Sequence, residues 1–333
     1  MKFQRRALAI LLGALVAVMA LTTFLTNRLF VSTTEQTETS QYEMMKSIIQ
    51  FNLGGVENSA QARAELVASL PRVRELFAAG NREALLAELK PMFDMQKDKF
   101  SVDQAQFHAI PAKSFLRLHN PTQFGDDLSS FRPIVVAVQK DFVSRKGLSI
   151  SRAGPGIFGV VPVFDRNDKP VGTFEFGSDF GGVLDRLKTA YGLETVLYMD
   201  EARLKNAAPD LGGEVYSEKN RVGRFVKFKS TNWELMRKLV GETELSTPGM
   251  ENQPYTREAQ DTPFGVVLVP LRNPAGEVLG MIAVAKDFSA SRSAMGQSTI
   301  WLAMYSLFGV VLLAGLVTIV IRGAVVRPIA ALN

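Results

Sequence analysis

The chain has 333 residues, more than one average domain requires, and a net charge of +5 at neutral pH. It contains no cysteine, so a disulfide framework and a thiolate metal site are excluded. Only two histidines are present, His108 and His119, and neither lies in a metal-binding or catalytic motif. Acidic and basic residues are mixed through the middle of the chain, without the basic stripe of a nucleic-acid-binding surface. We therefore expect no metal, no cofactor and no nucleic-acid partner.

The first element is an apolar run, Ala7–Leu25, which follows three basic residues. A run of this length can cross a bilayer as a helix, and basic flanks favour the cytoplasmic side. We predict a cytoplasmic N-terminus at 1–6 and a transmembrane helix at 7–29. The alternative is a secretion signal cleaved after Ala20, but the apolar run continues beyond that residue.

A helical stalk is predicted next, at 31–100. The stretch 35–70 has no proline, and its apolar residues recur at the spacing of one face of a long helix: Met45, Ile49, Val56, Ala60, Val67 and Leu70. This apolar seam is longer than one module could cover, so we predict that the helix packs against its copy in a homodimer. Two shorter helices are expected at 72–79 and 81–93, with Asn81 as the N-cap of the second.

The stretch 101–180 then predicts a first mixed module, because apolar and polar residues alternate along most of it. The expected order is two strands, one helix and three strands, at 104–110, 113–119, 127–142, 147–152, 157–165 and 171–179. This is the order of a PAS-like module. The predicted fold class is therefore α+β, with a long N-terminal helix followed by antiparallel sheets.

A second module with the same order is predicted at 181–290. Its expected helices and strands lie at 181–190, 194–199, 224–229, 233–240, 254–259, 263–271 and 277–286. Its last hairpin repeats that of the first module, since both contain an Arg-Asn pair in the turn and end in Asp-Phe: Arg166-Asn167 and Asp179-Phe180, then Arg272-Asn273 and Asp287-Phe288. The repeat indicates two like-folded modules in tandem. A chance similarity of two valine-rich hairpins is the alternative.

A second apolar run, Ile300–Ile321, follows these modules and carries no charge. Trp301 stands at its outer edge, where amphipathic rings settle in a membrane. We predict a second transmembrane helix at 299–321 and an extracytoplasmic region at 30–298. The protein is thus expected in the cell inner membrane, with two spans and a periplasmic region. A long buried helix of a soluble domain is the alternative for this run.

Four motifs in the first module resemble one known family. They are FLRLHNP at 115–121, FGDDL at 124–128, GVVPVF at 159–164 and VGTFEFG at 171–177. Together with the long helix and the flanking spans, they resemble the double Cache sensor regions of bacterial chemoreceptors, sensor kinases and diguanylate cyclases. The resemblance covers roughly residues 30–298. The segment 322–333 resembles the start of a HAMP linker.

The resemblance implies a transmembrane receptor whose first, membrane-distal module binds a small molecule. The signal is expected to pass through the second span to a cytoplasmic output domain beyond residue 333, of chemotaxis type, with its cytoplasmic signalling partners. The second, membrane-proximal module has weaker motifs. The ligand itself is not implied.

Candidate binding residues lie on the predicted strand 113–119. Because strand side chains alternate, Phe115, Arg117 and His119 are predicted to share one face. Arg117 and His119 are donors suited to a carboxylate or another small anion. The alternative is that Arg117 forms a structural ion pair with Glu175 or an aspartate.

Three further residues complete the predicted ligand-binding set. Glu175 could hold the amino group of an amino-acid ligand or pair with an arginine, and Arg152 could reach the cavity from the end of its strand. Phe158 is included in the set, although a core position is its simplest interpretation. Arg132 is expected on a solvated helix face.

Catalysis is not expected, because no nucleophile with its base and no paired catalytic carboxylates stand out. The adjacent carboxylates Asp126 and Asp127 are interpreted as capping residues at a helix start. Two other functions stay open: a membrane-anchored periplasmic hydrolase, and a docking module for a periplasmic binding protein.

Overall fold

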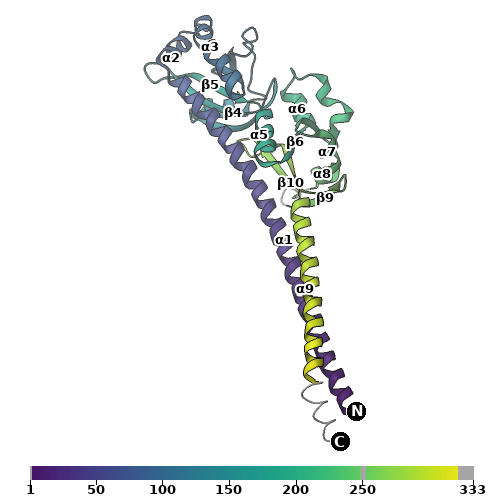
Figure 1. Ribbon diagram of the computed structural model, residues 1–333. Helices are drawn as coiled ribbons and strands as arrows, with labels where there is room; N and C mark the ends of the chain where they lie inside the picture. The colour runs from purple at the N-terminus through teal and green to yellow at the C-terminus, as the bar shows by residue number, and fades with distance from the viewer. Residues whose placement is uncertain (1, 248, 250–252, 322–333) are drawn as a thin grey trace. The chain divides into compact units, whose positions relative to one another are not determined.

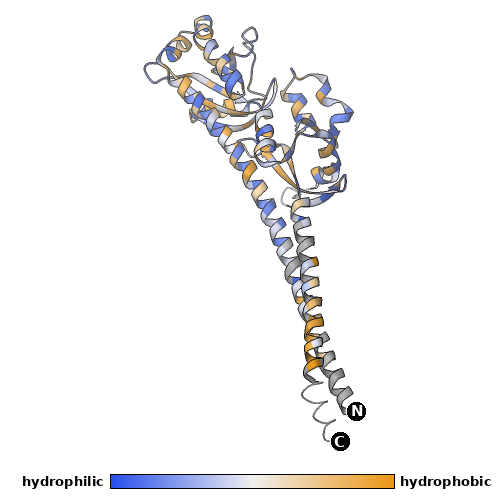
Figure 2. Ribbon diagram, in the orientation of Figure 1, coloured by the Kyte–Doolittle hydropathy of each residue, from blue (hydrophilic) through white to orange (hydrophobic). Residues whose placement is uncertain are grey.

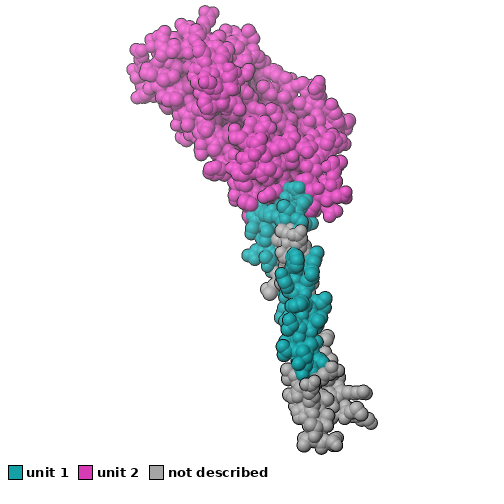
Figure 3. All heavy atoms as spheres, viewed as in Figure 1, with its two compact units in different colours: residues 1–41, 287–333 teal, residues 42–286 magenta. Residues whose placement is uncertain are grey.

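The computed structural model describes residues 2–247, 249 and 253–321 (Figure 1). The chain forms two units (Figure 3). The first unit contains both ends of the chain, 1–41 with 287–333, and the second unit contains residues 42–286.

The predicted stalk is helical, as expected. The Asn81 side chain caps the third helix by accepting a hydrogen bond from the Ala84 N–H (3.1 Å), which confirms the predicted N-cap. Gly80 separates the second helix from the third, with a positive φ of 66° that glycine adopts without strain. The helices are α1 (Lys2–Ser69), α2 (Pro71–Ala78) and α3 (Arg82–Phe100).

The predicted apolar seam of α1 is mostly buried inside the second unit, at Met45, Ile49, Ala60 and Val67. This face is covered within the chain, so it does not supply the dimer contact inferred from it. A different side of α1 exposes large apolar side chains, at Met44, Phe51 and Leu66.

The first sheet is antiparallel, with the strand order β2-β1-β5-β4-β3. It comprises all five strands predicted for the first module, with ends shifted by up to three residues. Their bounds are β1 (Val102–Ala109), β2 (Lys113–Arg117), β3 (Arg145–Ser151), β4 (Gly154–Phe164) and β5 (Pro170–Ser178).

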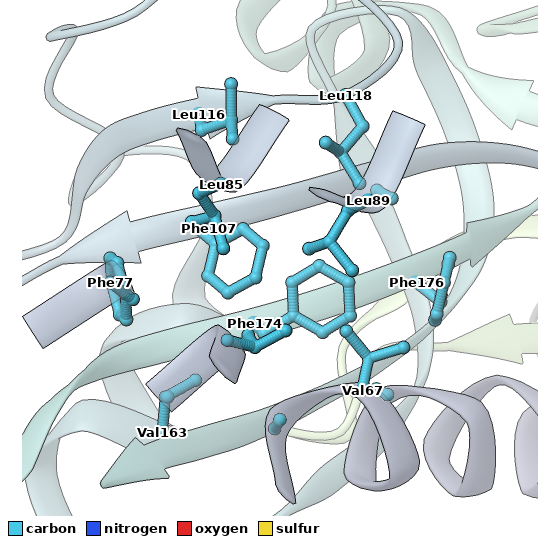
Figure 4. Packing of buried hydrophobic residues seen from close by; sticks show 14 of the residues in the cluster. Val67, Phe77, Leu85, Leu89, Phe107, Leu116, Leu118, Val163, Phe174 and Phe176 are labelled. Carbon is cyan, nitrogen blue, oxygen red and sulfur yellow. The ribbon is translucent and has the colours of Figure 1, made fainter. Parts of the chain in front are cut away.

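The two faces of this sheet differ in character, because successive side chains point to opposite sides. One face packs against α1, α2 and α3 in an apolar core (Figure 4): Val67, Phe77, Leu85, Leu89, Phe107, Leu116, Leu118, Val163, Phe174 and Phe176. Burial of each such side chain stabilises the fold by roughly 1.5–3 kcal/mol. The other face carries buried polar residues and lies under helix α4 (Pro133–Asp141): Gln104, Gln106, His108, Thr173 and Glu175.

Helix α4 begins six residues later than predicted. The prediction ran a helix from 127 through Pro133, but a proline inside a helix removes a hydrogen bond and disfavours helical geometry in the residue before it. The helix instead starts with Pro133 in its first turn, where proline is favoured, and Arg132 precedes it as the N-cap. The solvated position expected for Arg132 is wrong, because the residue is 2% exposed.

The second sheet has the strand order β7-β8-β6-β11-β10-β9. All the strands and helices predicted for 181–290 are present, and the short α6, α8 and β7 were not predicted. The elements are α5 (Gly181–Tyr191), β6 (Glu194–Asp200), α6 (Glu201–Ala207), β7 (Arg221–Val222), β8 (Phe225–Ser230), α7 (Trp233–Leu239), α8 (Glu242–Ser246), β9 (Tyr255–Ala259), β10 (Thr262–Arg272) and β11 (Val278–Asp287).

Both repeated hairpins are present, as β4–β5 and β10–β11, but their turns do not align as predicted. In the first turn the Asp165 carboxylate accepts hydrogen bonds from two backbone N–H groups (2.8 and 2.9 Å). In the second turn the Asn273 side chain does the same (3.0 and 2.9 Å). Asp165 is therefore the counterpart of Asn273, and the shared Arg-Asn letters are displaced by two residues.

The first unit contains the N-terminal part of α1 and the helix α9 (Ser289–Ile321). An ion pair between Arg292 and Glu38 (2.9 Å) and a hydrogen bond between Gln41 and Ser291 (2.9 Å) join the two helices. Figure 2 shows mostly hydrophobic residues along the C-terminal part of α9.

Within the part of the chain whose side chains are described, no helix has both the length and the apolar character needed to span a bilayer. The spans at 7–29 and 299–321 therefore stay predictions. The proposed start of a HAMP linker at 322–333 lies outside the described residues.

We expect Gly159→Ala to lower the free energy of unfolding by about 3 kcal/mol, because a Cβ at this position would overlap the backbone of Gln61 in α1. The control is Gly212→Ala, where φ is −61° and the added Cβ would meet none of the described residues within 4 Å beyond its chain neighbours. This control should stay within about 0.5 kcal/mol of wild type. Urea unfolding followed by circular dichroism measures both variants, and equal stabilities would contradict the close packing of β4 on α1.

Candidate functional site

A cavity of about 290 Å³ lies on the polar face of the first sheet. Its wall is mostly polar and combines strands β1, β2 and β3, the segment before α4 and one residue from beyond α6. The lining residues are Gln104, Gln106, Arg117, His119, Asn120, Gln123, Leu128, Phe131, Arg132, Ser151, Arg152, Ala153 and Asp210. Three of the six predicted site residues, Arg117, His119 and Arg152, are thus brought together.

Phe115 lies on the opposite face of the sheet, so the prediction that it shares a face with Arg117 is wrong. In the pairing of β1 with β2, Phe107 faces Leu116 and His108 faces Ser114. Phe115 is the extra residue of a β-bulge, which interrupts the alternation of side chains. Its ring therefore packs in the apolar core, 5.0 Å from the ring of Phe77.

Arg117 lines the cavity and forms an ion pair with Asp126, which is not among the described lining residues. Its guanidinium donates two hydrogen bonds to the Asp126 carboxylate, both 2.8 Å, and a third to the Gln123 carbonyl (2.9 Å). A two-pronged contact of this kind fixes the plane of the guanidinium. Arg117 lowers the pKa of Asp126, so this carboxylate stays charged. The interpretation of Asp126 and Asp127 as capping residues at a helix start is wrong, because α4 begins only at Pro133.

Glu175, on β5, is fully buried and is not among the described lining residues of the cavity. It is hydrogen-bonded to Arg132, and its other oxygen lies 3.6 Å from the His108 ring, too far for a hydrogen bond. Burial opposes the charge on Glu175, but the positive charge of Arg132 outweighs this effect, and the pKa of Glu175 falls. Burial lowers the pKa of His108 in turn, so the ring is neutral. The pairing of Glu175 with an arginine, left open above, is what the structure shows.

Three buried atoms of this cluster have no hydrogen-bond partner among the described residues: Arg132 Nε, His108 Nε2 and Glu175 Oε1. Buried polar atoms are normally paired, because an unpaired one costs about 1–3 kcal/mol. Arg132 lines the cavity, but its unpaired Nε is itself buried, so the contact open to a bound molecule is with the rest of the guanidinium. Arg132 is therefore one of three arginines that could contact a ligand, together with Arg117 and Arg152.

Phe158 supports this arginine and is not among the described lining residues. The Arg132 guanidinium lies over its ring, with the central carbon 4.4 Å from the ring centroid. Gly177 leaves room for that ring, because a Cβ there would overlap it. Phe158 is thus a core residue, the simplest of its predicted interpretations.

His119 lines the cavity with an uncharged ring. Its Nδ1 lies 3.2–3.3 Å from the backbone N and O of Ala105, and burial lowers its pKa to about 4. At neutral pH His119 therefore offers a neutral imidazole, and the positive charge of the wall comes from the arginines.

Arg152 pairs with Asp210, which no sequence pattern indicated as a site residue. The guanidinium donates two hydrogen bonds to the carboxylate (2.9 and 3.2 Å), and the Asp210 N–H donates to the Arg152 carbonyl (3.2 Å). Arg132 was also missed, although Pro133 directly after it was a signal that α4 starts there. The lining thus carries three arginines and one aspartate.

A second hollow of about 360 Å³ lies along α1 and α5. Its wall includes two strongly exposed phenylalanines, Phe51 and Phe100. The smaller cavity is the better site candidate, because its polar groups converge and are largely buried.

Comparison with known proteins identifies the family. Residues 53–291 match the family described as the double sensory domain of two-component sensor kinases. The match covers more than half of the chain, so the chain belongs to this double Cache family. The recognition made from the sequence motifs is confirmed. No curated protein is significantly similar in sequence.

Solved structures similar to the chain include an extracellular ligand binding receptor from Desulfohalobium retbaense, at 13% identity and a TM-score of 0.40. That alignment covers 74% of this chain and 40% of the receptor. Another is the sensory domain of the Campylobacter jejuni chemoreceptor Tlp3 with isoleucine bound, at 10% identity and a TM-score of 0.47. That alignment covers 78% of this chain and 94% of the Tlp3 domain. A third is the periplasmic domain of Vibrio cholerae LuxQ, at 10% identity and a TM-score of 0.43. That alignment covers 75% of this chain and 99% of the LuxQ domain.

We expect Arg132→Met to destabilise the protein by about 3–5 kcal/mol, because it leaves a fully buried carboxylate without its cation. Adding Glu175→Leu should recover most of this loss, since the unpaired charge is then gone. The control is Lys90→Met, which breaks an exposed pair with Asp94 on α3 and should cost less than about 1 kcal/mol. The measurement is urea unfolding. A double variant no more stable than Arg132→Met would contradict the buried pair.

Proposed function

We propose that this chain is the sensing part of a transmembrane receptor, and that its 290 Å³ cavity binds a small organic anion or an amino acid. The observation that carries the proposal is a cavity wall that holds three arginines and one aspartate. A carboxylate would match the planar donors of an arginine in this wall. Membership in a family of double sensory domains supports the same role.

The cavity also limits the size and polarity of the ligand. Its volume lies at the lower end of the range for small-molecule sites. The amide side chains of Gln104, Gln106, Asn120 and Gln123 can both donate and accept hydrogen bonds, so they suit hydroxyl or amino groups of the ligand. The proposed ligand is therefore a small polar carboxylate.

The receptor part of the proposal rests on the sequence. The apolar runs within 7–29 and 299–321, with their basic flanks, support two spans of the inner membrane and a periplasmic sensor. The signal would pass through the second span to a cytoplasmic output domain of chemotaxis type, joined by a HAMP linker that starts at 322–333. A ligand can move such an equilibrium only if it binds the two signalling states with different affinities.

The ligand class is tested by thermal unfolding of the full chain in detergent with L-amino acids and C2–C6 mono- and dicarboxylates, each beside its neutral amide. We expect at least one carboxylate to raise Tm and its amide to have no effect. A ligand at one hundred times its Kd adds about 2.7 kcal/mol of stability. Arg152→Gln should reduce the shift, whereas Lys90→Met, outside the cavity, should not.

The outcome also separates the competing functions. No shift with any probe would contradict the proposal and favour docking of a periplasmic binding protein. Consumption of a probe during incubation would favour the hydrolase.

A homodimer is also proposed, through the exposed side of α1. Met44, Phe51 and Leu66 lie on one side of the helix at 3.6 residues per turn, and Phe51 is 79% exposed. We expect the full chain to sediment as a dimer in detergent, and Phe51→Glu with Leu66→Glu to yield monomers. The control is Lys90→Met, away from this face, which should stay dimeric. A wild type that stays monomeric at every concentration would contradict the dimer.

A further inference from the structure

The β3–β4 turn belongs both to the cavity wall and to a contact with the second sheet. Arg152 and Ala153 line the cavity. Beside them, Gly154 lies against Phe228 of β8 and Leu211, so close that a Cβ would stand 3.2–3.3 Å from both side chains. A displacement of this turn would therefore move Leu211 or Phe228 of β8, which both follow β6 in the chain.

The contact between Arg152 and Asp210 is the polar part of this junction. It consists of two side-chain hydrogen bonds and one backbone bond, and both side chains are partly exposed, at 28% and 39%. A pair that water reaches contributes little stability and is exchanged readily. Since both residues line the cavity, a ligand carboxylate can reach the same guanidinium.

The other two arginines of the wall are less available. Arg117 and Arg132 are each about 97% buried at the side chain and are held by Asp126 and Glu175, which are not among the described lining residues. Arg152 is the arginine whose carboxylate partner itself lines the cavity. A ligand carboxylate that binds Arg152 therefore competes with Asp210 for the same guanidinium.

We propose that the ligand carboxylate and Asp210 compete for the Arg152 guanidinium, so that ligand binding releases the 208–211 turn from the first sheet. The inference rests on the proposed function, because it requires a carboxylate in the cavity. It names Arg152 as a residue that binds the ligand and couples its presence to the second sheet. The competition gives the ligand a different affinity for the joined and released states, as a signal requires.

The first test uses two variants that break the same contact with opposite expected effects. The probe is the carboxylate with the largest Tm shift in the panel above, and its Kd is measured by titration calorimetry on the full chain. Asp210→Asn removes the competitor and should tighten binding about two- to five-fold. Arg152→Gln removes the shared cation and should weaken binding at least about ten-fold. If the contact had a purely structural role, both substitutions would change the Kd in the same direction.

The matched control is Asp141→Asn. Asp141 accepts two hydrogen bonds from Arg145 (2.7 and 2.6 Å) at the end of α4, and neither residue is among the described lining of the cavity. This variant should leave the Kd unchanged.

The second test separates competition from a simple change in electrostatic attraction. The Asp210 amide N–H donates to the Arg152 carbonyl, so its hydrogen exchange reports on the junction. Bound probe should raise exchange at 208–211 at least two-fold in wild type. Asp210→Asn should exchange fast without the probe and show no further rise.

The outcomes distinguish this inference from the proposed function. If no carboxylate of the panel binds, both are overturned. A second outcome is that a carboxylate binds to the wild type without raising hydrogen exchange at 208–211. In that case only the competition at Arg152 is overturned, and the proposed function stands. The competition at Arg152 is also overturned if Asp210→Asn and Arg152→Gln change the Kd in the same direction.

Discussion

A buried ion pair fixes the polar side of the first sheet. Arg132 and Glu175 are almost fully removed from water, where opposite charges persist only if they are held together. Glu175 lies on β5, the central strand, and Arg132 directly precedes α4, so the pair ties the start of this helix to the middle of the sheet. Phe158 supports the guanidinium from one side. The position of α4, and with it the outline of the cavity, depends on this pair.

The cavity is assembled from segments that are distant in the sequence. Arg117 comes from β2, Arg132 from the residue before α4, and Arg152 from the β3–β4 turn. Asp210 comes from beyond the last strand of the first sheet. Each arginine has an acidic partner, which limits the excess of positive charge and keeps the guanidinium groups in fixed planes. The arrangement suits a small anion and links the site to the second sheet through one exposed pair.

Sequence periodicity predicted most of the fold, because alternation and helical spacing follow from which face of an element is buried. The two hairpins and all strands of both sheets except β7 were predicted in this way. The Asn81 cap was predicted from its residue type. The bulge at Phe115 was not, since its cause is the pairing of β2 with β1 rather than any local signal. The start of α4 was missed through neglect of Pro133, and this error placed Arg132 on the wrong surface.

The sequence by itself determined the family, the α+β class, the two apolar runs and the presence of Arg117, His119 and Arg152 near one another, because these depend on local patterns and motifs. Only the tertiary structure decided which charges are paired. It placed Arg132 over Glu175, Asp126 behind Arg117 and Asp210 on Arg152. Arg132 and Glu175 lie 43 residues apart in the chain, and Arg152 and Asp210 lie 58 apart. Such distant partners meet through sheet order and helix packing, and no local pattern in the sequence indicates the contact.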